Sequence, residues 1–266
     1  MTSPAAVAMT IITTTITTTT TTMPMVTAIT TATTTSMAET AAAAALYRLL
    51  AWMSPAYPVG AFSYSHGLEW AVETGDITDL KSLVGWLTVV LEEGSGVADA
   101  TFCAHAHRAV SAGDAAALAE VAELALAFQP SKERRLETTA QGNAFMAATE
   151  AAWPVAPLAL VRGAWDGPVA YPVAVGAATA AHGIAEATAV HAFLHAVAAN
   201  LISAAVRLVP LGQTDGQRAL AALEPVVGAT AGVARSLALD AIGGHALRSD
   251  LASMRHETQY TRLFRS

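Results

Sequence analysis

Residues 186–208 read EATAVHAFLHAVAANLISAAVRL, and this stretch decides the class of fold. Residues 187–206 carry no formal charge, a run long enough to cross a membrane as one helix. However, His191, His195 and Asn200 interrupt the run, and polar groups are costly at bilayer depth. No cluster of Lys or Arg and no aromatic belt flanks it. We therefore interpret this stretch as the buried core helix of an all-α protein rather than as a membrane span.

Segments with apolar residues at helical spacing continue on both sides of this stretch. Gly, Pro or Asp separates them, and no alternating strand pattern of useful length appears. The pattern predicts a single-domain, all-α helical bundle of about ten helices, in which Pro225 splits the last two and Gly243-Gly244 ends regular structure. The expected helices cover residues 39–53, 65–74, 80–93, 97–111, 114–128, 130–153, 168–181, 186–208, 217–223 and 226–239.

The composition excludes several functional classes. The chain has 14 Lys and Arg against 21 Asp and Glu, a formal net charge of −7, so it lacks the clustered cations that bind nucleic acid. Cys103 is the single cysteine, which excludes an internal disulfide framework and a Cys-rich zinc site. Because no secretory signal is present, the cysteine usage suggests a reducing, cytoplasmic setting.

The two ends of the chain differ from its middle. Residues 1–38 contain no charged residue and consist largely of a Thr tract, which lacks the large apolar side chains that offset ordering entropy. We predict that residues 1–38 are disordered and that residues 39–247 form the helical domain. The charge pattern becomes ordinary after Met37, which suggests that translation begins there.

Residues 248–266 read RSDLASMRHETQYTRLFRS and are far richer in charged and aromatic residues than the preceding helices. Tyr, Met and Arg are enriched at protein interfaces. We therefore expect residues 248–266 to be a docking tail that becomes ordered on binding a partner.

The sequence offers little for catalysis. His191 and His195 are four residues apart on one helical face and could share a metal ion, which leaves a metal-dependent hydrolase as an alternative function. Two ligands without a suitably spaced carboxylate favour ordinary core histidines instead. Ser65 lacks the Gly two residues earlier that a nucleophile elbow requires. We predict no catalytic residue, no resident metal and no cofactor.

Three separated stretches resemble the UreF family of urease accessory proteins. Residues 54–69, SPAYPVGAFSYSHGLE, match the pattern SPxxPxGxFxxSxGLE, and residues 204–217, AAVRLVPLGQTDGQ, are similar to AAxRLxPLGQxxGQ. The third stretch is the tail MRHETQYTRLFRS, residues 254–266. The resemblance covers about residues 39–266, and the Thr tract is the one departure from the family pattern.

The resemblance implies an all-helical homodimer without a reaction of its own. It implies three protein partners: a UreD/UreH-type accessory protein that holds the tail, a UreG-type GTPase whose activity is modulated, and apo-urease, which receives nickel. The implied GTPase face consists of Ser63, Ser65, Gly67, a surface-exposed Glu69 and, more loosely, Gln213. The implied tail anchors are Arg255, His256, Glu257, Tyr260, Arg262 and Phe264.

Overall fold

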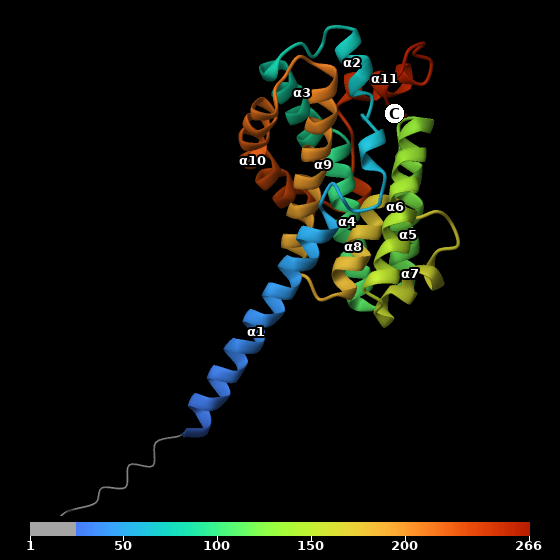
Figure 1. Cartoon of the computed structure of the whole chain (residues 1–266). Helices are drawn as coiled ribbons and strands as arrows, with labels where there is room; N and C mark the ends of the chain where they lie inside the picture. The colour runs from blue at the N-terminus through green and yellow to red at the C-terminus, as the bar shows by residue number, and fades with distance from the viewer. Residues whose placement is uncertain (1–24) are drawn as a thin grey trace, which may run out of the picture. The chain divides into compact units, whose positions relative to one another are not determined.

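The computed structural model describes the backbone of residues 25–266 and the side chains of residues 39–266 (Figure 1). The chain divides into two compact units, Met1–Ala42 and Ala43–Ser266. From residue 25 onward it contains eleven α-helices, three short 3-10 helices and no strand, which confirms the all-α prediction. Helix α1 comprises Met25–Trp52, and every later helix belongs to the second unit.

Helix α1 begins earlier than the sequence predicts. The expected helix starts at residue 39, whereas the backbone is helical from Met25. Residues 41–45 are all Ala, the strongest helix former, and a helix nucleated there propagates at low cost. The part of the predicted disordered segment before residue 25 lies outside the described residues.

Most predicted helices are present, and three of them begin after residues whose side chains cap the helix. The side chains of Asp79, Asp114 and Ser131 each accept a hydrogen bond from the backbone N–H three residues later. The helices are α2 (Leu68–Glu73), α3 (Leu80–Glu93), α4 (Ser95–Ala112), α5 (Ala115–Ala127), α6 (Lys132–Ala152), α7 (Ala159–Ala164), α8 (Tyr171–Ala181), α9 (Glu186–Leu208), α10 (Gln213–Ser236) and α11 (Leu247–His256). The 3-10 helices are Ala61–Ser63, Ala156–Leu158 and Leu239–Ala241.

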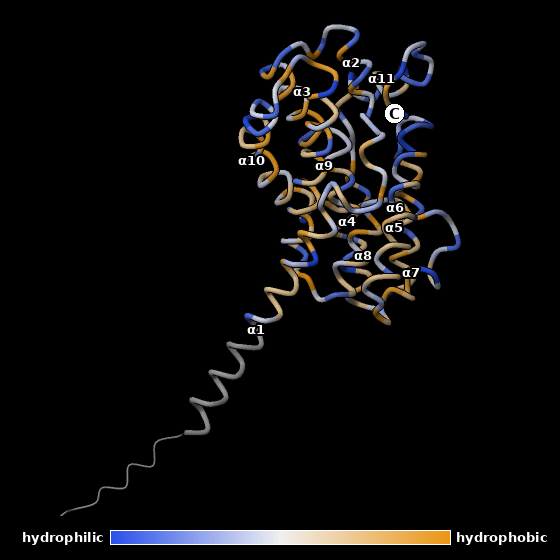
Figure 2. Tube along the Cα trace, in the orientation of Figure 1, coloured by the Kyte–Doolittle hydropathy of each residue, from blue (hydrophilic) through white to orange (hydrophobic). Residues whose placement is uncertain are grey.

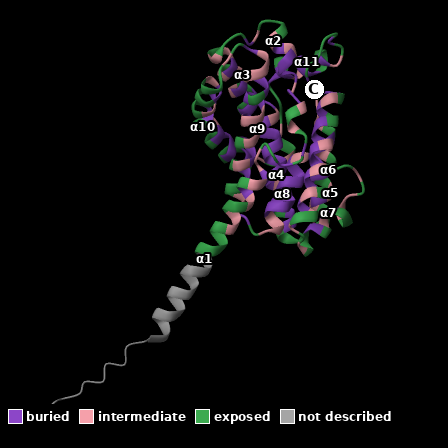
Figure 3. Cartoon of the chain, viewed as in Figure 1, coloured by how far each residue is buried: buried purple, intermediate pink, exposed green. Residues whose placement is uncertain are grey.

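Helix α9 is the buried core helix that the sequence predicts. By length and composition it could cross a membrane, but half of its most apolar window is buried inside the protein. It packs against α10, α4 and α8. Figure 2 shows the hydropathy of these helices, and Figure 3 shows that α4 and α8 are buried over most of their length.

Three predictions about helix number and position were wrong. Pro225 does not split the chain into two helices, because α10 runs continuously from Gln213 to Ser236. Pro225 is exposed, so the carbonyl group that loses its N–H partner can be hydrated at the surface. Helix α7 was missed, and regular structure resumes after Gly243-Gly244 as α11, within the predicted tail.

The contact between α4 and α8 depends on a glycine. A side chain at Gly176 would overlap the carbonyl oxygen of Cys103, whereas Gly232, on the outer side of α10, has open space around it. We expect Gly176→Ala to lower the free energy of unfolding by about 3 kcal/mol, because the backbones of two packed helices must separate. Gly232→Ala should instead raise it by up to about 1 kcal/mol through helix propensity. Urea unfolding of both variants tests this, and equal effects would contradict it.

Candidate functional site

The loop that precedes α2 places two residues of the first motif, His66 and Gly67, in an unusual backbone conformation. His66 has a φ of 63° and Gly67 a φ of 76°, so two successive residues are left-handed. A Cβ atom on Gly67 would lie 2.6 Å from the backbone nitrogen of Ser253 in α11. The glycine therefore allows the backbone of the tail helix to pack directly on the loop.

Glu69 is buried, which corrects the expectation that it lies on the surface. Its side chain is in the first turn of α2, and the residue is only 8% exposed. The carboxylate accepts hydrogen bonds from the backbone N–H groups of Leu263 and Phe264, at 2.6 and 3.0 Å. It also lies 3.1 Å from Nε2 of His256. Its partners are thus all supplied by the chain's own tail.

His256 continues this network to helix α6. Its Nδ1 lies 2.6 Å from a carboxylate oxygen of Glu133, and Arg262 donates to the other oxygen of Glu133 at 2.6 Å. The His256 side chain is completely buried. A buried ring that is hydrogen-bonded to two carboxylates is favourable only while the three groups remain together, because a buried polar group without a partner is costly.

Four further hydrogen bonds fix the last residues of the tail. The backbone N–H of Ser65 donates to the carbonyl oxygen of Ser266 at 2.7 Å, and the N–H of Arg265 donates to the carbonyl oxygen of Ser63 at 2.8 Å. The Ser65 hydroxyl also donates to Ser266, whose own hydroxyl donates to Glu137 at 2.6 Å. We call the contact between residues 63–69 and residues 253–266 the tail junction.

The tail junction unites most of the predicted site residues. It contains Ser63, Ser65, Gly67 and Glu69 from the predicted GTPase face and His256, Arg262 and Phe264 from the predicted tail anchors. Glu257 lies beside it and accepts from the backbone N–H of Lys132. Arg255 and Tyr260 are exposed, as is Gln213 at the start of α10, which makes no hydrogen bond to the junction.

Sequence reasoning missed the residues of α6 that support the junction. Arg134 and Glu137 are buried and form an ion pair, and Glu133 binds the tail as described. Burial by itself raises the pKa of the Glu137 carboxyl, but Arg134 and His66 outweigh it and hold that pKa well below its usual range. The signal was visible, because residues 132–137 carry the densest charge in the chain, KERRLE.

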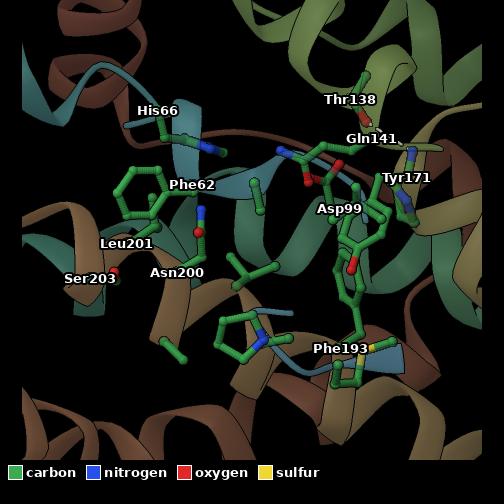
Figure 4. Close-up of a pocket in the computed structure, with 18 of the residues that line it drawn as sticks. Phe62, His66, Asp99, Thr138, Gln141, Tyr171, Phe193, Asn200, Leu201 and Ser203 are labelled. Carbon is green, nitrogen blue, oxygen red and sulfur yellow. Dashed lines mark hydrogen bonds between the residues drawn. The ribbon is translucent and has the colours of Figure 1, made fainter. Parts of the chain in front are cut away.

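A cavity of about 120 Å³ lies next to this ion pair. Figure 4 shows His66, Asp99, Gln141 and Asn200 facing it from the loop, α4, α6 and α9. Asn200, which interrupts the apolar run of α9, therefore faces a partly polar hollow. Burial raises the pKa of Asp99 to about 6, although Arg134 acts in the opposite direction. Burial also lowers the pKa of His66, which favours its neutral form.

Asp99 should make stability depend on pH. Its pKa in the folded chain, about 6, is above the ordinary 3.8, so the folded state binds this proton more tightly and loses stability as pH rises from about 4 to above 6. We expect Asp99→Asn to remove this loss. When the pH rises from 4 to 7.5, the free energy of unfolding of the variant should therefore increase relative to that of the parent, by at most about 3 kcal/mol. Urea unfolding at both pH values is the measurement, and an unchanged difference between the two chains would contradict the assignment.

The described residues provide no metal centre. Among residues 39–266, no group of three or more His, Cys, Asp and Glu side chains is placed to hold a metal ion. His191 and His195 are exposed rather than buried, which corrects their interpretation as core residues. They line a groove whose other wall contains Leu46 and Leu50 from the last turns of α1.

Comparison with known proteins places this chain among close relatives. The family model named UreF matches residues 77–224. Urease accessory protein UreF of Rhodopseudomonas palustris strain BisB5 is 62% identical over 223 residues, which cover 84% of this chain and 92% of that protein. Urease accessory protein UreF of Bradyrhizobium diazoefficiens is 58% identical over 223 residues, covering 84% of this chain and 92% of that protein.

Proposed function

Because this chain belongs to the UreF family of urease accessory proteins, we propose that it is a scaffold for the insertion of nickel into apo-urease. In this role it binds a UreD/UreH-type accessory protein and a UreG-type GTPase, whose activity it modulates. The family consists of accessory proteins, so the chain is not an enzyme, and the alternative of a metal-dependent hydrolase using His191 and His195 is wrong. We place its action in the cytoplasm.

The main support for this proposal is that the outer face of α11 is apolar and exposed. Leu247, Leu251 and Met254 follow one another at helical spacing and are 67%, 46% and 45% exposed. The opposite face is buried and consists of Ser249, Ala252, Ser253 and His256. A helix whose polar side is buried and whose apolar side is exposed is typical of a protein-binding surface. We assign this face to the UreD/UreH-type partner.

Exposed residues of the tail junction, together with Phe62 directly before it, support a second contact, with the GTPase. Phe62 and Leu263 are 67% and 65% exposed, and Arg265 is exposed beside them. Since Glu69 is buried, we propose that it acts by fixing the shape of this surface rather than by touching the GTPase. A scaffold can favour one state of a GTPase only through its different affinity for the two states. Gln213 remains a proposed additional contact.

The proposed homodimer has support from another surface. Leu46, Tyr47 and Leu50 on the last turns of α1 are 58%, 70% and 67% exposed. They are close together on the helix, and Leu46 and Leu50 line the groove that contains His191 and His195. Exposed apolar side chains in a contiguous group favour association, and a two-fold axis would bury the same patch of both copies.

A paired charge substitution tests the assignment of the α11 face. We expect Leu251→Asp with Met254→Asp to weaken capture of the UreD/UreH-type partner by more than tenfold, because two carboxylates must be desolvated at the interface. The matched control is Val233→Asp, which places a charge at a side chain 52% exposed on α10. Co-purification and melting temperature are measured for both. Normal capture by a folded double variant would remove this face from the interface.

A further inference from the structure

The last five residues of the tail are held by contacts of the kind that bind a separate peptide. We propose that Ser63, Ser65, Glu69, Glu133 and Glu137 form a peptide-binding groove, and that residues 262–266 of a second copy of this chain fill it in trans. In the structure, the groove holds the same segment of its own chain. The inference concerns the groove itself and does not depend on the partners proposed above.

The first argument is the backbone pairing. The two hydrogen bonds that join Ser63 to Arg265 and Ser65 to Ser266 connect the main chains of two segments. Tyr64, between the two serines, is extended, with a φ of −122° and a ψ of 137°. Main-chain hydrogen bonds between two segments are also what gives a bound peptide much of its affinity.

The second argument is the use of Glu69 as a clamp. One carboxylate accepts from two successive backbone N–H groups, those of Leu263 and Phe264. Together with Arg265, three consecutive amides of the segment are therefore satisfied by the groove. Hydrogen bonds to an ionised acceptor are stronger than neutral ones, so this clamp contributes affinity that does not require a covalent connection.

The third argument is the alternation of side chains, which gives selectivity. Phe264 and Ser266 are buried, at 4% and 1% exposure, whereas Leu263 and Arg265 point outward. The guanidinium group of Arg207 lies 4.4 Å from the centre of the Phe264 ring. The backbone bends at Leu263 and Phe264, so the segment is recognised by its two buried side chains, Phe264 and Ser266, rather than as a regular strand.

Charge adds to this selectivity. Glu69, Glu133 and Glu137 line the groove, and Arg262 of the segment pairs with Glu133. The residues that connect α11 to the segment contribute less. Thr258, Tyr260 and Thr261 are exposed, and of residues 258–261 only Gln259 is buried. Because the anchors lie within the segment and its connection is largely exposed, the same contacts are available to a segment from another copy.

The test uses two full-length variants with complementary defects. Glu69→Gln weakens the groove but leaves the segment intact, while Phe264→Ala weakens the segment but leaves the groove intact. When the two chains are mixed, the intact segment of the first can occupy the intact groove of the second. We expect the mixed pair to associate at least tenfold more tightly than either variant does with itself, measured by fluorescence anisotropy with one chain labelled. Both variants keep the α1 surface, so a dimer formed through α1 contributes equally to the mixed pair and to each variant alone. The difference between the two affinities therefore reports only the exchange of segments.

A synthetic peptide supplies the second measurement. A labelled peptide of residues 257–266, ETQYTRLFRS, should bind the Phe264→Ala chain at least tenfold more tightly than the parent chain, whose own segment competes at an effective concentration of about millimolar. The same peptide with Ala in place of Phe264 should bind at least tenfold more weakly than the parent peptide. If the Phe264→Ala chain fails to fold, Ser266→Gly, which removes only the hydroxyl bound to Glu137, replaces it in both experiments. A folded variant that neither takes up the peptide nor pairs with the Glu69→Gln chain overturns the proposal.

Discussion

Gly67→Ala is expected to displace α11 and to lower the free energy of unfolding by at least about 3 kcal/mol. The new methyl group would lie 2.6 and 2.7 Å from the backbone nitrogen and Cα of Ser253. A flexible side chain could move away from such a contact, but a helix backbone can do so only as a unit. The left-handed φ of Gly67 adds a conformational penalty for any residue with a Cβ.

Gly75→Ala is the matched control for this variant. Gly75 also has a left-handed φ, 80°, but no atom lies within 4 Å of the position of its Cβ. Its substitution therefore measures the conformational penalty alone, which we expect to be about 1 kcal/mol. Urea unfolding of both variants separates the two contributions. Equal losses would show that α11 does not depend on close approach to the loop.

Glu69→Ala is expected to lower the free energy of unfolding by about 3–5 kcal/mol and to release residues 262–266. The substitution removes the acceptor of two backbone N–H groups and a hydrogen-bond partner of the buried His256. Amide hydrogen exchange is the most direct measurement. The amides of Leu263 and Phe264 should lose protection, while those of the core helix α9 should change much less.

The control for Glu69 is a second carboxylate at the edge of the same region. Glu257 accepts one hydrogen bond, from the backbone N–H of Lys132, and is only partly buried. Glu257→Ala should cost about 1 kcal/mol, as expected for the loss of a helix cap. If Glu69→Ala were as mild as Glu257→Ala, the carboxylate clamp would have no energetic importance, and the peptide-binding groove would lose its main support.

Much of the fold could be predicted because the signals are local. Asp79, Asp114 and Ser131 precede their helices and satisfy the first free N–H groups, so helix starts are readable from a few residues. Pro225 was misread because its effect depends on which side of α10 faces solvent. That orientation is set by packing, which local sequence does not encode.

The site was predicted only in part, for a similar reason. The motif residues were identified, but Glu69 and Leu263 are 194 positions apart in the sequence, and helical spacing carries no information about such a contact. Glu69 was therefore expected to be exposed, whereas the tail buries it. Arg134 and Glu137 were visible only as a dense charge cluster, which usually indicates a solvated helix face.

The tail junction also has a consequence for the order of folding. Its two halves are separated by nearly the whole helical unit, so residues 63–69 leave the ribosome long before residues 262–266 do. During synthesis, Glu69 has no access to the amides that later surround it. Closing so long a loop is slow compared with forming local helices. We therefore expect the surface that we assign to the GTPase to form last, after the remaining helices have assembled.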